Sequence, residues 1–113
     1  LKQRLELAAY RLSLAEFLEM VEAQPQHWDV VLNWASFLRQ HAFKLEKTSW
    51  ETIWERWNQH SDAHLRRLSL ESLLVHTAGF GWSEQSRQRL RHFQQDDSDL
   101  VTGRAQFVFP PPL

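Results

Sequence analysis

The stretch TSWETIWERW, residues 48–57, holds three of the six tryptophans of the chain. Trp50, Trp54 and Trp57 follow one another at i, i+4 and i+7, so on an α-helix they share one face. Thr48 is followed three residues later by a glutamate, which is a capping-box signature and places the helix start at Thr48. We therefore predict an amphipathic helix whose tryptophans all point from one side into protein.

Few helix-breaking residues interrupt the rest of the chain. Three glycines and four prolines occur among 113 residues, and three of those prolines fall within the last four positions. Hydrophobic residues make up 42% and charged residues 24%, which is ordinary for a globular domain. The sequence predicts an all-α fold of five to seven helices, arranged as a compact bundle or as a short stack of helical hairpins.

Apolar residues at helical spacing mark the other helices. Residues 25–45 form the longest such segment, and we expect it to be the central helix because apolar side chains cover most of its circumference. A single helix over residues 1–23 is an alternative to two shorter ones. The predicted segments are 1–12, 13–23, 25–45, 62–68, 70–78 and 83–94.

In the leucine-rich part of the chain after residue 62, the leucines do not fall on one face of a single helix. We therefore predict a break at Ser69. In one unbroken helix Leu70 and Leu74 would lie opposite the leucines that precede them. Ser69 is a competent N-cap for a new helix, and the break removes the conflict. We expect Gly79 and Gly81 to end this helix and Ser83 to cap the last one.

A short internal match is compatible with stacked hairpins. RLSLAEFL at residues 11–18 and RLSLESLL at residues 67–74 share their first four residues and the final leucine. Each leads into a helix, a Pro or Gly break, and a tryptophan before a capping residue. The match is short and consists of common residues, so both arrangements of the helices stay open.

The composition changes after residue 95. The acidic stretch over residues 96–99 is typical of a loop, and residues 100–109 are compatible with a small β-hairpin that turns at Gly103 and Arg104. The consecutive prolines that follow must be extended and suit a linker. We predict a helical domain over residues 1–95 and an irregular or hairpin tail over residues 96–113.

Composition also limits the classes of function. The chain contains no cysteine, which excludes disulfides, thiolate metal sites and cysteine catalysis, and which favours an intracellular, cytoplasmic setting. No apolar run approaches the roughly 18 residues of a membrane helix, so we expect no membrane partner. The formal net charge of −1 gives the chain as a whole no attraction for nucleic acid. Because the first residue is a leucine within a helical pattern, we expect a fragment of a larger protein.

The tryptophans are the candidate partner-binding residues. A buried tryptophan contributes about 150–250 Å² of area, and three on one short helix exceed what a single neighbouring helix easily covers. The stripe is either clamped within the core or left partly exposed as a groove, where tryptophan is a frequent binding hot spot. We predict a non-catalytic protein–protein interaction or scaffolding module that recognises another protein or another domain of the same chain. Its candidate residues are Trp50, Trp54 and Trp57, with Trp28 and Trp82 behind them.

An alternative hypothesis rests on the arginines of RQRLRH, residues 87–92. The last two helices and a terminal hairpin could form a winged helix in which Arg87, Arg89 and Arg91 meet phosphates or base edges of nucleic acid. The aspartates that follow would repel the nucleic-acid backbone. Alternate residues also fan around a helix, so these arginines do not form one tight cluster.

The same stretch resembles the R-x4-H motif of HEPN-type ribonucleases, which are all-helical proteins of similar size. The resemblance covers six residues of one helix. It implies that Arg87 and His92 would act together on an RNA backbone. Gln88 matches only loosely the polar residue that usually follows the arginine in that family.

The stretch HSDAH, residues 60–64, could bind a metal if its histidines shared a helix face. Ser61 and Asp62 have the character of helix caps, which places His60 and His64 across a helix boundary. Neither a Gly-rich phosphate loop nor a nucleophile elbow occurs in the sequence. We therefore predict no metal site, no cofactor and no catalytic residue.

Overall fold

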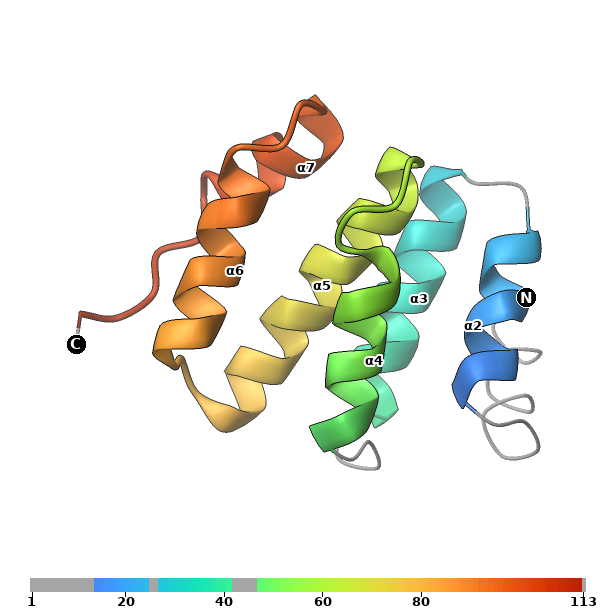
Figure 1. The fold of residues 1–113 in the computed structure, drawn as a ribbon, viewed down its shortest axis with the longest axis horizontal. Helices are drawn as coiled ribbons and strands as arrows, with labels where there is room; N and C mark the ends of the chain where they lie inside the picture. Colours follow the sequence, from blue (N-terminus) through green and yellow to red (C-terminus); the bar gives the residue numbers. More distant parts are fainter. Residues whose placement is uncertain (1–13, 25–26, 42–46, 113) are drawn as a thin grey trace.

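The protein is built from α-helices that pack around one oblique helix (Figure 1). The computed structural model describes residues 14–24, 27–41 and 47–112. The predicted all-α class is confirmed, while the helix predicted over residues 1–12 lies outside the described residues. The helices within them are α2 (Leu14–Ala23), α3 (Trp28–His41), α4 (Lys47–Trp57), α5 (Ala63–Phe80), α6 (Glu84–Gln94) and α7 (Asp99–Ala105).

Helix α5 is the centre of the fold, rather than the helix predicted over residues 25–45. It contacts α3 and α4 on one side and α6 and α7 on the other (Figure 1). Contrary to the prediction, α5 continues unbroken through Ser69, which is buried in its middle. A helix that is apolar all round is stable when it is covered all round, so opposed leucines require no break.

Two hydrophobic clusters meet on α5. Leu65 and Leu68 belong to the first cluster, whereas Leu70 and Leu73 belong to the second. The second cluster joins α5 to α6 and α7 through Leu90, Phe93, Val101 and Ala105. The first cluster joins α5 to α2, α3 and α4 through Leu18, Val21, Val31, Trp34, Phe37, Leu38, Trp50, Ile53 and Trp57.

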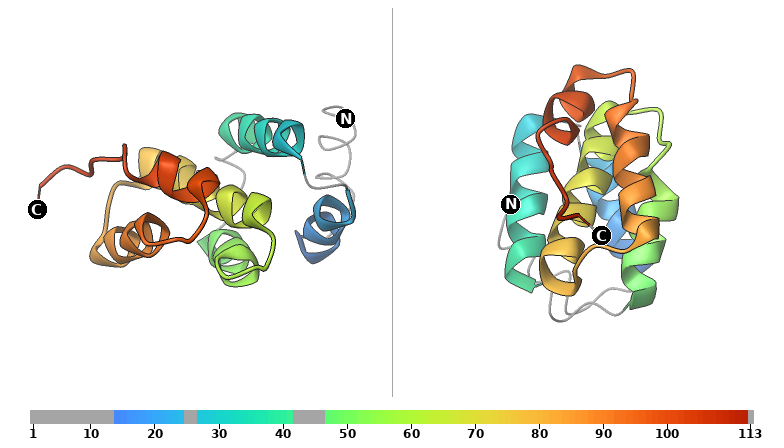
Figure 2. Two further views of the ribbon diagram at one scale, coloured as in Figure 1. Left: turned by 90° about the horizontal axis from the view of Figure 1, so that it is seen from above. Right: turned by 90° about the vertical axis from the view of Figure 1, so that its left-hand side faces the viewer.

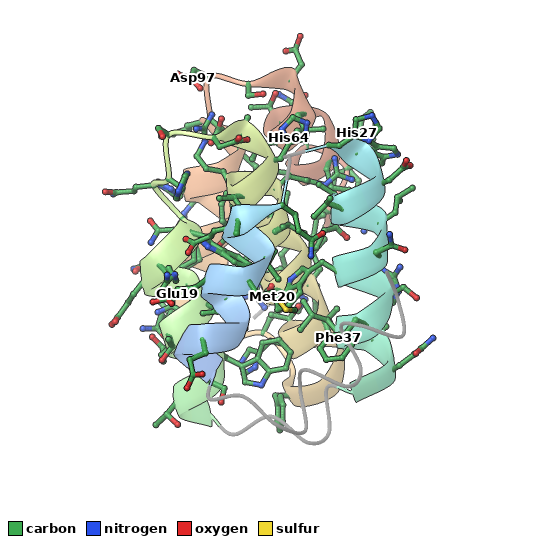
Figure 3. The ribbon with its side chains drawn as sticks, turned by 90° about the vertical axis from the view of Figure 1, so that its right-hand side faces the viewer. Glu19, Met20, His27, Phe37, His64 and Asp97 are labelled. Carbon is green, nitrogen blue, oxygen red and sulfur yellow. The ribbon has the colours of Figure 1, made fainter. Side chains whose placement is uncertain are left out.

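Helix α2 is tied to α4 by polar contacts at the edge of the first cluster. The Glu22 carboxylate accepts hydrogen bonds of 2.6–3.1 Å from the Arg56 guanidinium and one of 3.0 Å from the indole Nε1 of Trp57. The hydrogen bond from Arg56 is the main reason why the pKa of Glu22 is lowered. Figure 3 shows Met20, which packs against the first cluster, directed inward, and its neighbour Glu19 directed outward.

Three of the predicted helix ends, Asp62, Gly81 and Ser83, are found as capping residues. Asp62 is the N-cap of α5, and its carboxylate accepts from the backbone N–H two residues later at 2.8 Å. Gly81 is the C-cap, at a φ of 83° that favours glycine, and Ser83 caps α6 through a capping box. The start predicted for the tryptophan helix is wrong, because α4 already includes Lys47 and Thr48 lies in its first turn.

The C-terminal segment contains helix α7 instead of the β-hairpin predicted over residues 100–109. Ser98 caps this helix by accepting from the backbone N–H of Leu100 at 3.3 Å. Val101 and Ala105, four residues apart on one helix face, are completely buried in the second cluster, and this burial favours the helix. Beyond α7 the tail runs away from the helices (Figure 2).

A buried carboxylate couples α7 to α5. Glu71 is 6% exposed, and it accepts hydrogen bonds from Arg67 at 2.9 Å and from Arg104 at 3.2 Å. Arg67 also donates to the backbone carbonyl of Leu100 at 2.7 Å. Since a buried charge is stable only when paired, these contacts hold α7 in place.

A second buried ion pair holds the loop before α7. Arg66 donates to the Asp96 carboxylate at 2.9 and 3.2 Å and to Asp97 at 3.1 Å. The Asp96 side chain is 6% exposed, whereas that of Asp97 is 94% exposed. Burial raises the pKa of Asp96, but the hydrogen bonds from Arg66 and from the Ser98 backbone N–H outweigh it, so the pKa is lowered.

Candidate functional site

A cleft of about 640 Å³ lies between α4, α5 and α6. These three helices are seen side by side in Figure 1, with α5 passing between the other two. The volume lies within the range of about 300–1,000 Å³ that is usual for binding sites. The cleft is therefore the candidate functional site, and each of the three helices supplies one wall.

The α4 wall consists of Trp50, Glu51 and Trp54, which is one turn of the predicted tryptophan stripe. Trp50 is 5% exposed, and the centroid of its ring lies 5.2 Å from that of the His76 ring. Trp54 is half-buried and meets Phe93 of the second cluster edge-on at 5.4 Å. The two tryptophans belong to different hydrophobic clusters, and the cleft opens where these clusters adjoin.

The α5 wall was missed by the sequence analysis. At about 100° per residue, Ser69, Leu73, His76 and Phe80 form a single stripe along α5, and all four line the cleft. The predicted break at Ser69 separated the first of these residues from the others. One unbroken helix over residues 63–80 would have placed them together.

The α6 wall contributes a charge that is already neutralised. Arg89 donates to the Glu51 carboxylate at 3.0 and 2.7 Å, which joins α6 to α4 across the cleft. Its guanidinium carbon also lies 4.5 Å from the ring centroid of Trp54, in a cation–π contact. The Arg89 side chain is 14% exposed, so this contact stiffens one side of the cleft.

Most of the serines that line the cleft have hydrogen-bond partners. Ser83 and Ser86 bond to each other's backbone N–H in the α6 capping box. Ser72 donates to the Leu68 carbonyl at 2.8 Å and accepts from the Trp34 indole at 3.5 Å. These hydroxyls are therefore committed to the fold.

Two buried groups in the walls lack such a partner within the described part of the chain. They are the indole Nε1 of Trp50 and the hydroxyl Oγ of Ser69. The two residues are 5% and 2% exposed, so bulk solvent does not reach these groups. Buried polar groups in native proteins are nearly always hydrogen-bonded, so each of these two groups calls for an explanation.

The other predicted tryptophans lie outside the cleft. Trp57 is completely buried in the first cluster, and its ring meets Trp34 edge-on at 5.4 Å. Trp82 is half-buried and packs against the second cluster. Trp28 is 39% exposed at the start of α3, with the Arg67 guanidinium 4.8 Å from its ring centroid. The structure thus brings Trp50 and Trp54 together at one site and places the other three elsewhere.

The arginines of the nucleic-acid hypothesis do not share one surface. Arg89 faces Glu51 in the cleft, while Arg91 is exposed and only loosely paired with Glu84 at 3.4 Å. Arg87 has its Nε atom buried without a hydrogen-bond partner among the described residues. The predicted wing is replaced by α7, so this hypothesis gains no support from the fold.

His92, the histidine of the HEPN-like motif, is engaged in packing. Its Nε2 lies 3.2 Å from the carbonyl oxygen of Asn58, and its ring meets Trp54 edge-on at 5.6 Å. These contacts tie the His92 ring to α4 and to Asn58, the residue that follows α4. The resemblance to these ribonucleases therefore stays a prediction.

The histidines at residues 60 and 64 stabilise the turn before α5. The backbone N–H of Asp62 donates to Nδ1 of His60 at 3.0 Å, and Nδ1 of His64 lies 3.0 Å from the Asp62 carboxylate. Asp62 is the N-cap, so the pair does straddle a helix boundary as predicted. Over residues 14–24, 27–41 and 47–112, no group of three or more potential ligands is arranged to bind a metal ion.

Ser69 and His76 lie on the same stripe of α5 but are seven residues apart, a rise of about 10 Å, so they do not form a nucleophile–base pair.

Among the described helices, none has the length and apolar character needed to cross a membrane. Comparison with protein-family models, curated proteins and solved structures gave no match to this chain.

Proposed function

We propose that the protein is a non-catalytic helical interaction module whose α4–α5–α6 cleft binds a segment of a partner polypeptide. The segment belongs to another protein or to another domain of the same chain. The observation that supports this function is the pair of buried donors in the cleft walls, Trp50 Nε1 and Ser69 Oγ. A buried polar group without a partner costs about 1–3 kcal/mol, which a bound acceptor would recover.

A polypeptide offers the chemistry that complements these walls. Its backbone carbonyls are acceptors for an indole N–H and a serine hydroxyl. Its apolar side chains would cover the rings of Trp54 and Phe80, which line the cleft. Tryptophan and arginine are also the residues most often found as hot spots of protein interfaces.

Binding requires a small rearrangement of the cleft wall. The two donors are shielded from solvent, so a carbonyl reaches them only after neighbouring side chains rotate. Changes of side-chain rotamer are common when proteins bind one another. Phe80 lies at the end of α5 and is 67% exposed, the highest value among the large hydrophobic residues that line the cleft.

The charges of the cleft favour a polypeptide over a nucleic acid. Among the described residues that line it, Arg89 is the only arginine or lysine, and Glu51 already neutralises its charge. A phosphate backbone would have to displace a carboxylate that makes two hydrogen bonds. A neutral polypeptide segment does not have to displace the Glu51 carboxylate from Arg89.

Selection of peptides tests the proposal. A random peptide library displayed on phage is selected against the immobilised chain, and the affinities of recovered peptides are measured by calorimetry. We expect the change Phe80→Ala to weaken binding about tenfold, because it removes a ring from the cleft wall. Duplex DNA offered at low salt should not compete with these peptides.

The change Phe107→Ala is the matched control. Its ring is 73% exposed, close to the 67% of Phe80, but it lies after α7 and outside the cleft. Both rings are exposed, so neither change should unfold the protein, which circular dichroism verifies. Failure to recover any peptide, or peptides that bind both variants as tightly as wild type, would refute the proposed function.

A further inference from the structure

The segment that follows α7 is mostly apolar and exposed. Phe107 and Phe109 are 73% and 81% exposed, the highest values among the large hydrophobic side chains of the described residues. Val108 between them packs against the second cluster, which anchors the segment to the body of the protein. Figures 1 and 2 show the chain after this anchor running outward, beyond α6 and away from α4. The segment therefore does not fill the cleft of its own molecule.

The sequence of this segment fixes its conformation. Three consecutive prolines, residues 110–112, lock φ near −65°, and the residue before a proline is held extended. Such a chain adopts the polyproline II helix, with three residues per turn and a rise of about 3.1 Å per residue. Phe109 and Pro112, three residues apart, therefore share one edge of that helix.

The proline segment can accept hydrogen bonds through its carbonyl oxygens, but its prolines cannot donate them. Prolines have no N–H, and a polyproline II helix makes no internal hydrogen bonds, so its carbonyl oxygens point outward and unpaired. Residues 105–113 contain no charged side chain, and the guanidinium of Arg104 before them donates to Glu71. A partner must therefore supply aromatic surface and neutral donors, rather than opposite charge.

We infer that residues 109–112 are a ligand for a partner domain that binds polyproline II segments in a groove walled by aromatic side chains. Such grooves recognise a conformation that the free ligand already has, so little ordering entropy is lost on binding. The Phe109 ring would occupy the groove together with Pro112, and indole or phenol groups would donate to the prolyl carbonyls. In this interaction the chain is the ligand, and the inference does not depend on the α4–α5–α6 cleft.

The spacing of the prolines limits which kinds of Pro-binding groove can accept the segment. Residues 109–113 do not contain two prolines three residues apart, because Pro110 is followed three residues later by Leu113, so this segment does not supply the proline pair that some grooves require. SH3 domains recognise this P-x-x-P spacing, whereas WW and EVH1 domains also bind Pro-rich segments in aromatic-lined grooves. We therefore expect the partner groove to be of the WW or EVH1 kind.

Purified SH3, WW and EVH1 domains are the probes for this inference. Each is titrated into the whole 113-residue chain, and binding is followed by calorimetry. We expect a WW or EVH1 domain to bind, the SH3 domain not to bind, and Phe109→Ala to weaken binding about tenfold. Phe107→Ala is the matched control with a similarly exposed ring outside the proline helix, and it should bind as wild type does.

Three results would overturn the inference. The first is that no WW or EVH1 domain binds the chain. The second is that the two phenylalanine changes weaken binding equally, which would indicate unspecific contact with exposed rings. The third is that the chain dimerises with rising concentration in sedimentation experiments and loses this behaviour on Phe109→Ala, because the occupant would then be a second copy.

Discussion

Leu68 and Leu70, two residues apart on α5, are both completely buried and belong to different hydrophobic clusters. Successive residues on a helix are rotated by about 100°, so these two side chains point in nearly opposite directions. One helix thus supplies apolar groups to both clusters. The two halves of the fold share α5 as a common element.

Replacing either leucine should destabilise the whole protein. We expect Leu68→Ala and Leu70→Ala each to lower the free energy of unfolding by about 2–5 kcal/mol, because each leaves a cavity in a closed cluster. Urea denaturation followed by circular dichroism measures this change, and both variants should unfold in a single transition. Leu32→Ala is the control, because Leu32 is 47% exposed and its loss should cost less than about 1 kcal/mol. Two separate transitions would contradict the shared role of α5.

The class of the fold was predictable because apolar residues at helical spacing indicate amphipathic helices in a sequence. The tryptophan helix needed only a periodicity of 3.6 residues, and the caps Asp62, Gly81 and Ser83 followed from local chemistry. The central helix was misassigned for a physical reason. A helix buried on all sides has no single apolar face, so the sequence of α5 resembles two short helices in conflict.

The C-terminal segment shows a different limit of sequence analysis. Gly103 and its surroundings have the local character of a turn, and the residues around them favour strands. The helix is stabilised instead by tertiary contacts, namely the burial of Val101 and Ala105 and the pairing of Arg104 with Glu71. Such contacts are invisible in a single sequence.

The pair Arg66–Asp96 predicts a stability that depends on pH. The pKa of Asp96 is lower in the folded protein than in the unfolded chain, where it is about 3.9. Its stabilisation is therefore fully present above about pH 5 and is lost as the pH falls through the folded-state pKa. At pH 7 we expect Asp96→Asn to lower the free energy of unfolding by about 1–3 kcal/mol, and this difference should shrink in acid.

Asp97→Asn is the matched control for this pair. Asp97 contacts the same arginine at 3.1 Å but is 94% exposed, so solvent screens the interaction. Its replacement should change stability by less than about 0.5 kcal/mol at any pH. Equal effects of the two changes, or an Asp96 effect that grows in acid, would show that burial of the pair is not what matters. Thermal unfolding between pH 3 and pH 7, a range set about the reference pKa, separates these cases.

Loss of the buried Glu71 carboxylate should destabilise the protein more than loss of either arginine that pairs with it. Glu71→Gln leaves Arg67, which is 14% exposed, without its counter-charge, and we expect a loss of about 3 kcal/mol. Arg104 is 42% exposed, so Arg104→Ala should cost about 1 kcal/mol or less. In the Glu71→Gln protein, amide hydrogen exchange should be faster in α7 than in α4. Unchanged exchange in α7 of the Glu71 variant would contradict its role in holding that helix.

The candidate site was predictable only in part. Trp50 and Trp54 were identified because tryptophans at helical spacing stand out in any sequence. Ser69, His76 and Phe80 were not, because their alignment depends on α5 being continuous. The unpaired state of the Trp50 and Ser69 donors could not be foreseen, because it depends on the distances between side chains of different helices.

The most direct test of the proposed cleft is the change Ser69→Ala, with stability and peptide affinity measured on the same sample. Alanine favours the helix interior and removes an unpaired buried hydroxyl, so we expect unfolding to require about 0.5–2 kcal/mol more. Ser72→Ala, which removes the hydroxyl that accepts from the Trp34 indole, should instead cost about 1 kcal/mol. Peptides selected on the wild-type chain should bind Ser69→Ala more weakly even though the protein has become more stable. A Ser69→Ala protein that is less stable, or that binds those peptides as tightly as before, would contradict the account.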